Sequence, residues 1–243
     1  MISIVVPCLN EEEHLPYFLD SLILQRAPFE LIVIDGGSED DSRRLIDTFR
    51  ERIQITGLID ETRNLGYVRN KGALCARGDP LLFTNSDAVL PEGLLFYVEK
   101  QFQKDQKLLA LTGRTMPWEG GILCVFAYAA FDLLRWAFSK IGRFSPSGNF
   151  LALRSFVFWA VGGFPEKRVN EDGELGIRLS DYARDHGGKL RFHLGLYTGH
   201  WAVRFRKGFF KTLMFYGYVF GNFSPVLKRL LEKIETRSSR AFE

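Results

Sequence analysis

One acid in this sequence, Asp87, ends an apolar run and follows small polar residues, a pattern that could bind a cation. Residues 80–90 read PLLFTNSDAVL, so the apolar side chains give way to Asn85, Ser86 and Asp87. Hard oxygen donors of this kind suit Mg²⁺ or Mn²⁺ bridging a diphosphate. A turn that caps the next helix is the competing interpretation, because a single acid in a short motif is a weak signal.

A second acid, Asp35, begins the sequence Asp-Gly-Gly-Ser after another apolar run. Gly37 would let the backbone approach a ligand closely, and the carboxylate could accept hydrogen bonds from a base or a ribose. An ordinary turn between strand and helix, with Ser38 capping the helix, is the alternative. The chain has no G-x-G-x-x-G after its first strand and no G-x-x-x-x-G-K-[ST], which argues against a dinucleotide enzyme and a P-loop protein.

Two adjacent acids, Glu171 and Asp172, follow a glycine turn at residues 161–165 and stand at the start of a predicted helix. One carboxylate of such a pair can act as a general base while its neighbours hold the other, although acids at a helix start also simply complement the helix dipole. His200 follows a strand-like segment, and its neutral imidazole would complete an oxygen-rich metal site. A packed or surface histidine is the commoner role for a lone His.

Alternating strands and helices must position these residues. Such alternation gives an α/β fold, with a doubly wound, mainly parallel sheet flanked by helices. Asn10, Asp35 and Asp87 each follow a strand, so all three should lie in one crevice at the carboxyl edge of the sheet. The predicted strands are 2–7, 31–34, 53–59, 80–83 and 108–114, and the predicted helices are 11–24, 41–52, 66–77 and 93–104.

Composition excludes several classes of protein. The net charge is +3, from 32 basic and 29 acidic residues, which does not indicate a nucleic-acid binder. Cys8, Cys75 and Cys124 have neither zinc nor disulfide spacing, so we expect a reducing compartment, the cytoplasm. The first residues show no basic leader or cleavage site, so we expect no secretory signal. The most apolar segment, 120–138, contains Asp132 and Arg135, so we expect no membrane span.

Taken in order along residues 2–200, these motifs resemble those of the family 2 glycosyltransferases of the GT-A fold. Residues 4–11 and 33–38 are similar to the nucleotide-binding segments, and 64–79 to the helix before the metal motif. Residues 85–87 stand where the family has Asp-x-Asp, and 147–149 resemble the glycine loop near the donor sugar. Residues 171–172 resemble the acidic pair that contains the catalytic base, and residue 200 the metal histidine.

The resemblance implies an inverting transfer of a sugar from a nucleotide diphosphate sugar to an acceptor hydroxyl or phosphate. Asp172, beside Glu171, would be the catalytic base, and Asp87 with His200 would hold Mn²⁺ or Mg²⁺. Asn85 departs from the family by replacing the first acid of Asp-x-Asp, which removes one charge from the metal site. The residues implied to bind the nucleotide sugar are Pro7, Leu9, Asn10, Glu11, Asp35, Gly37, Asn64, Arg69, Asn85, Ser86, Asp87 and Gly148.

The whole chain, 1–243, would then be a single GT-A domain. Residues 1–114 would form the nucleotide-sugar half and 115–206 the acceptor and catalytic half, which is rich in aromatic helices. Residues 207–243 would form amphipathic C-terminal helices. Within them, residues 207–231 are strongly aromatic and bracketed by basic residues, which suits an interfacial helix, a lipid-linked acceptor and the inner face of the cell membrane. A core helix or a homodimer contact is the alternative.

Two other functions compete with sugar transfer. A sugar-1-phosphate nucleotidyltransferase uses a related sheet and metal, but it would be expected to carry a Gly-rich, Arg-containing loop after the first strand, where this chain has PCLNE at 7–11. A non-catalytic nucleotide-sugar binding protein is the other alternative. The presence of both Asp87 and Asp172 argues against it, whereas Asn85 favours it.

Overall fold

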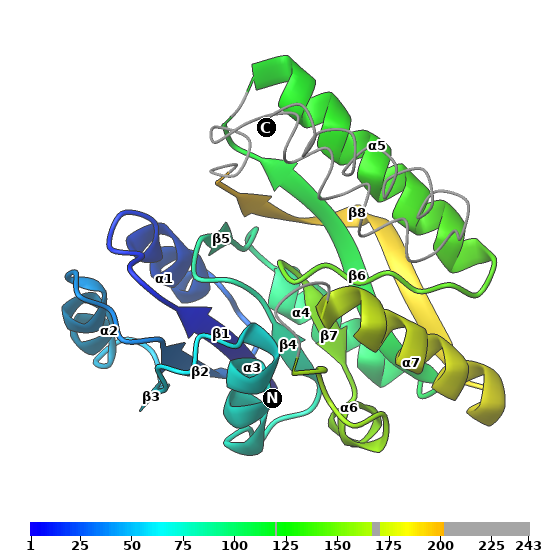
Figure 1. Cartoon of the computed structure of the whole chain (residues 1–243), viewed down its shortest axis with the longest axis horizontal. Coiled ribbons are helices and arrows are strands. Elements are labelled where there is room, and N and C mark those ends of the chain that lie inside the picture. The colour runs from blue at the N-terminus through cyan, green and yellow to red at the C-terminus, as the bar shows by residue number, and fades with distance from the viewer. Residues whose placement is uncertain (120, 167–170, 202–243) are drawn as a thin grey trace, which may run out of the picture.

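The computed structural model describes residues 1–119, 121–166 and 171–201, and these form one eight-stranded sheet with helices on both faces (Figure 1). The strand order is β3-β2-β1-β4-β7-β6-β8-β5. The strands are β1 Ile2–Cys8, β2 Phe29–Asp35, β3 Ile55–Ile59, β4 Leu81–Phe83, β5 Ala88–Val89, β6 Leu108–Pro117, β7 Leu151–Leu153 and β8 Lys189–His200.

The first half of the chain builds the parallel side of this sheet. β1 pairs in parallel with both β2 and β4, and β2 pairs in parallel with β3, as expected when each strand is followed by a crossover helix. The predicted alternation is confirmed here. The helices are α1 Leu15–Ile23, α2 Ser42–Phe49, α3 Leu65–Leu74, α4 Leu94–Lys104, α5 Gly121–Lys140, α6 Ser155–Ala160 and α7 Glu171–His186.

Two local expectations about helix starts were wrong. The first helix begins at Leu15 rather than at residue 11, and Pro16 occupies its first turn, where a missing amide hydrogen is tolerated. Ser38 does not cap α2, because its hydroxyl donates to Asp35 Oδ1 at 2.5 Å. The N-cap of α2 is Asp41, which makes no side-chain capping bond.

Apolar side chains from the two faces of the sheet form two cores, which is the packing of a doubly wound fold. On one face, α1, α2 and α4 pack against alternate residues of β1 and β2. On the other face, α3, α6 and α7 cover the intervening residues of the same strands and of β4. Because nearly every residue of β1 and β2 is buried on one side or the other, these strands read as largely apolar runs.

Beyond β4 the sheet becomes mixed. β7 is antiparallel to both β4 and β6, β6 is parallel to β8, and β5 is antiparallel to β8. The pairing of β5 with β8 aligns Ala88 with His200, so it joins the polar turn after β4 to the end of the last described strand. This long-range pairing brings the turn that carries Asp87 beside His200.

Helix α5 lies along β6 and β8 (Figure 1). Asp132 and Arg135, both on the sheet-facing side of this helix, are buried, and Nη1 of Arg135 lies 2.9 Å from Oδ1 of Asp132. The expectation that these charges exclude a membrane span was too strict, because α5 has 20 residues and a mean hydropathy of 1.5, enough to cross a membrane by length and composition. The segment 207–231, which carried the membrane prediction, lies outside the described residues.

Candidate active site

The carboxylate of Asp35, the last residue of β2, is held by its own loop. Its Oδ1 accepts hydrogen bonds from the amide of Ser38 at 3.0 Å and from the Ser38 hydroxyl at 2.5 Å, and Arg43 donates to Oδ2. The Ser38 oxygen also accepts from the Asn10 amide at 3.0 Å, so the loops after β1 and β2 are joined. Asp35 and Asn10 therefore meet at one edge, as the sequence indicated.

Two backbone positions fix the shape of this edge. Asn10 has a φ of +53°, and its side chain accepts a hydrogen bond from the Glu39 amide at 2.9 Å. Asn is one of the few non-glycine residues that tolerate this left-handed conformation. Gly37 has a φ of +89°, and a Cβ there would lie 2.9 Å from Cγ of Glu61. A side chain at position 37 would thus be both strained and crowded.

Asp87 lies on the turn between β4 and β5, facing the end of β8. Its Oδ2 is 3.2 Å from Nδ1 of His200. Its Oδ1 and that Nδ1 are both buried, and neither makes a hydrogen bond within the described residues. A carboxylate oxygen and an imidazole nitrogen left in this state suit a shared divalent cation, which would satisfy both.

The donor set available to a metal is small. Within 1–119, 121–166 and 171–201, no group of three or more His, Cys, Asp and Glu residues is arranged to hold one. Mg²⁺ and Mn²⁺ commonly take one or two protein ligands and complete their coordination with substrate phosphates and water. Asp87 and His200 therefore fit a cation that arrives with a diphosphate.

Arg69, on α3, connects the turn that carries Asp87 to the start of α7. Its guanidinium donates to Glu171 Oε1 at 3.2 Å, to Asp172 Oδ1 at 3.1 Å and to Asn85 Oδ1 at 3.0 Å. Its carbon Cζ lies 5.1 Å from the centre of the Phe164 ring, and the side chain is fully buried. Arg69 therefore fixes the positions of the acidic pair and of Asn85 together.

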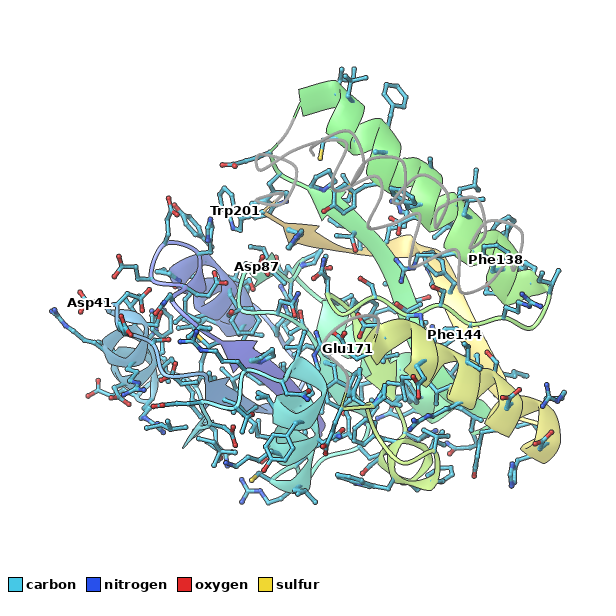
Figure 2. All side chains as sticks on the ribbon, in the orientation of Figure 1. Asp41, Asp87, Phe138, Phe144, Glu171 and Trp201 are labelled. Atoms are coloured by element: carbon cyan, nitrogen blue, oxygen red, sulfur yellow. The ribbon has the colours of Figure 1, made fainter. Side chains whose placement is uncertain are left out.

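The two acids at the start of α7 differ in access to solvent. The side chain of Asp172 is 27% exposed and that of Glu171 only 11%. Gly148 packs against this point, because a Cβ there would lie 2.7 Å from both Asp172 Oδ2 and an Arg69 nitrogen. Figure 2 marks Glu171 at the head of α7 and Asp87 near the end of β8. Of the pair, Asp172 is therefore the one more open to solvent.

The amide of Asn85 makes two opposite hydrogen bonds. Its oxygen accepts from Arg69, and its nitrogen donates to Asn149 Oδ1 at 2.6 Å. The Asn149 carbonyl in turn accepts from Thr84 at 2.8 Å. A carboxylate at position 85 could accept from Arg69 but could not donate to Asn149, so the departure from Asp-x-Asp is matched to its surroundings.

A comparison with known proteins decides the family. The model of glycosyl transferase family 2 matches residues 3–161, which include β1 to α6 and the turn that carries Asp87. The chain belongs to this family.

Solved structures share the GT-A fold with this chain. Over 82% of this chain, the mannosyltransferase PcManGT from Pyrobaculum calidifontis, in complex with GDP-Man and Mn²⁺, superposes with a TM-score of 0.67 at 21% identity, covering 56% of that chain. The crystal structure of S. aureus TarS superposes with a TM-score of 0.65 at 18% identity, over 82% of this chain and 36% of that one. At these identities the likeness shows the fold alone.

Curated relatives are similar in amino-acid sequence to this chain over part of their length. A poly(ribitol-phosphate) beta-glucosyltransferase of Bacillus spizizenii is 33% identical over 128 residues, 48% of this chain and 20% of that protein. An O-antigen chain rhamnosyltransferase of Salmonella typhimurium, RfbN, is 28% identical over 179 residues, 69% of this chain and 57% of that protein. The match therefore spans less than two thirds of either relative.

The remaining nucleotide-binding predictions fall in different surroundings within the glycosyltransferase. Pro7 lies within β1 opposite Ile34, and Leu9 is exposed in the loop that follows. Ser86 is buried in the turn before Asp87. Asn64 caps α3 through a hydrogen bond that its oxygen accepts from the Tyr67 amide at 3.2 Å, so its side chain already has a structural partner.

Glu11 and Cys8 lie in a strongly acidic part of the glycosyltransferase. Burial, with the charge of Asp87 next in importance, raises the pKa of Glu11 to about 7. Burial, with the charge of Asp35 next, raises the pKa of the Cys8 thiol to about 12. The charge of Asp87 contributes to the raised pKa of Glu11 after burial, so these two carboxyl groups lie near one another.

A cluster of aromatic residues borders this site and was not foreseen from the sequence. The Trp201 ring lies at a tilt to the rings of His14 and Tyr17, with ring centres 5.1 and 5.3 Å apart, and it meets the Trp118 ring edge-on at 5.4 Å. In Figure 2, Trp201 and Asp87 are marked close together. His14, to which the sequence gave no role, also lies 3.4 Å from Glu11 Oε2. Only the sequence neighbourhood of His200 hinted at Trp201.

Proposed function

We propose that this glycosyltransferase moves a sugar, with inversion at the anomeric carbon, from a nucleotide diphosphate sugar to an acceptor hydroxyl or phosphate. One observation carries the proposal. Asp87 Oδ1 and His200 Nδ1 are buried without hydrogen bonds within the described ranges, while Asp87 belongs to the same turn as Asn85, which Arg69 ties to Asp172. This arrangement supports a cation-and-diphosphate site that lies beside a base.

Each residue then has a chemical task. Asp35 and Asn10, held rigid by the Ser38 bonds, contact the nucleoside. Asp172 accepts the proton of the acceptor hydroxyl as its oxygen forms a bond to the anomeric carbon, and the nucleoside diphosphate leaves with the electrons of the broken bond. Asp87 and His200 would hold Mn²⁺ or Mg²⁺, which when bound neutralises the charge on the departing diphosphate.

Structures that share the GT-A fold support the donor and the metal. One of these structures, PcManGT, is a complex with GDP-Man and Mn²⁺, and another, TarS, is a complex with UDP-GlcNAc. A relative named dolichyl-phosphate beta-glucosyltransferase, 28% identical over 99 residues, supports a lipid-linked acceptor. We place the enzyme in the cytoplasm at the inner face of the membrane, with residues 207–231 as one contact and a homodimer as the alternative use of that segment.

The division of labour follows the two halves of the chain. Residues 1–114 bind the nucleotide sugar, and 115–206 supply the base, the histidine and the acceptor side. A non-catalytic binding module would keep the first half working without the second. A nucleotidyltransferase would instead join a sugar phosphate to a nucleoside triphosphate and release pyrophosphate, so the product distinguishes it from a sugar transferase.

A screen of nucleotide sugars tests this proposal. Each sugar nucleotide is added with and without Mn²⁺, the melting temperature is measured, and release of the nucleoside diphosphate is followed for those that bind. We expect one donor to stabilise the enzyme only with metal, and Asp172→Asn to keep that shift while losing most of the turnover. Donor binding without turnover in the native chain would favour the binding module, and an unchanged rate in Asp172→Asn would refute the base.

A further inference from the structure

The outer side of α5 is almost entirely apolar and is open to solvent. Ile122, Leu123 and Phe126 are 72%, 68% and 65% exposed, and Leu133 and Leu134 continue the same face. Large apolar side chains exposed singly are normal, but a contiguous row along a helix marks a contact surface. The outer face of α5 is defined here by Ile122, Leu123, Val125, Phe126, Ala129, Ala130, Leu133, Leu134, Ala137 and Ile141.

The inner side of α5 fixes which way that face points. Asp132 Oδ2 accepts a hydrogen bond from the Thr115 amide of β6 at 3.0 Å. Arg135 donates to the Ser145 carbonyl at 3.0 Å and lies 5.0 Å from the centre of the Phe192 ring of β8. If the helix were turned over, the ion pair of Asp132 and Arg135 would lose these buried partners. The charged side chains therefore face the sheet, and the apolar residues of the outer face point away from it.

This inward pairing also distinguishes two ways of meeting a membrane. A spanning helix would need its polar groups satisfied inside the hydrocarbon, and here they are satisfied by the sheet of the same domain. A helix with one apolar face and its polar side held by protein instead lies in the plane of the interface, with its apolar residues just below the headgroups. By this reasoning α5 contacts the bilayer from the side.

The charged residues near the outer face of α5 indicate which kind of surface this face would contact. From residue 120 to 165 the sequence contains one acid, Asp132, and that acid is buried. At the C-terminal end of the face, Lys140 and Arg143 are exposed, and the Lys140 nitrogen lies 5.4 Å from the Trp136 ring centre. Exposed cations and a tryptophan beside an apolar face complement anionic lipid headgroups.

We infer that the outer face of α5 docks in the plane of an anionic lipid bilayer. Helix α5 packs on β6, which Trp118 follows, and on β8, which ends at His200. This contact would therefore bring the candidate active site to the membrane surface. The inference rests on the proposed transfer to a lipid-linked acceptor and assigns the surface that meets the lipid. It differs from the role proposed for residues 207–231, because it assigns lipid binding to α5.

Vesicle binding by matched single variants tests the inference. Leu123→Glu places a charge on the outer face, and Leu74→Glu makes the same change at an equally exposed leucine, 73% exposed, at the end of α3. The full chain is sedimented with phosphatidylcholine vesicles with and without phosphatidylglycerol. We expect binding to the anionic vesicles, a loss of roughly tenfold or more in Leu123→Glu, and wild-type binding in Leu74→Glu.

Each other result would overturn the inference. Equal binding by Leu123→Glu and the native chain would assign the lipid contact to another segment, 207–231 first. No vesicle binding, together with a dimer that Leu123→Glu converts to a monomer, would assign the face to a second copy. Melting temperature confirms that both variants fold. Donor hydrolysis in solution is measured in parallel. If the native chain hydrolyses no donor, that result contradicts the proposed function but leaves the result on vesicle binding intact.

Discussion

Two strand ends in this glycosyltransferase carry an acid after a buried apolar run, yet the acids are held in opposite ways. Asp35, at the end of β2, has both carboxylate oxygens occupied by Ser38 and Arg43. Asp87, after β4, has one buried oxygen without a hydrogen bond in the part of the chain that the structure describes. The same sequence pattern thus yields a rigid, satisfied carboxylate at one end and an unsatisfied one at the other.

The difference indicates what each end can bind. A carboxylate already satisfied by protein donors is pre-organised and offers its remaining lone pairs to a neutral polar ligand, such as the hydroxyls of a ribose. A buried carboxylate oxygen without a donor is unfavourable until a cation or a donor reaches it. We therefore expect substitutions at the two ends to separate donor binding from metal dependence.

The largest effect should follow Asp87→Ala. Without this carboxylate the diphosphate loses its bound cation, so we expect turnover to fall by roughly a thousandfold and Mn²⁺ to stop influencing the rate. Nucleoside diphosphate release with and without Mn²⁺ measures both. Asp79→Ala is the control, because Asp79 lies before β4, at the opposite end of the same strand, and pairs with Arg154. A variant that still responds to Mn²⁺ would remove Asp87 from the metal site.

A smaller effect of a different kind should follow Asp35→Ala. We expect KM for the donor to rise roughly tenfold to a hundredfold, because a charged hydrogen-bond acceptor for the nucleoside is lost, while kcat at saturating donor changes little. Steady-state kinetics over a wide donor range separates the two parameters. A fall in kcat with unchanged KM would instead place Asp35 at the reacting centre and end the contrast with Asp87.

Asn85→Asp should sharpen the contrast by a few-fold only. The new charge beside Asp87 should raise Mn²⁺ affinity by roughly threefold, since one more carboxylate strengthens an oxygen-rich site. Part of that gain should be offset by loss of the hydrogen bond to Asn149, and Asn149→Asp provides the matched change of charge one contact further away. The Mn²⁺ concentration that gives half the maximal rate measures this change in Mn²⁺ affinity. An identical Mn²⁺ dependence in Asn85→Asp and the native chain would show that residue 85 does not influence that affinity.

The smallest effect on turnover should come from Glu30, near the start of the strand that ends in Asp35. Burial alone would raise the pKa of Glu30, but hydrogen bonds from Ser3 and Arg77 lower it below its ordinary value. This pairing stabilises the fold above the unfolded pKa of Glu30, and the stability is lost as pH falls through the lower folded value. Glu30→Gln should lower the melting temperature at neutral pH, flatten its acid dependence below about pH 4.5 and leave turnover unchanged.

Much of the donor side could be foreseen because its information is local. Apolar runs of four to seven residues, each followed by a polar loop, gave strands whose ends meet at one edge, and Asn10 and Asp35 indeed share Ser38. Glu171 does begin a helix. The sequence also expected His200 to follow a short strand, whereas it ends a strand of 12 residues that pairs with the turn after β4.

The parts that could not be foreseen depend on contacts between distant segments. The family resemblance implied that Arg69 binds the nucleotide sugar, and nothing local shows that it is buried beneath Glu171, which lies 102 residues away. The meeting of His14 with Trp201 likewise joins α1 to the end of β8. For α5, composition showed an apolar helix, but only packing on β6 and β8 reveals which side remains outside.

Mn²⁺ binding in the presence of a nucleoside diphosphate tests the central claim, that Asp87 is the metal-binding carboxylate, most directly. Free Mn²⁺ is followed by its paramagnetic resonance signal in titrations of the native chain, Asp87→Asn and Asp35→Asn, with UDP and GDP in parallel. We expect Asp87→Asn to lose Mn²⁺ binding at every nucleotide concentration and Asp35→Asn to regain it as nucleotide is raised. Undiminished binding by Asp87→Asn would contradict the assignment.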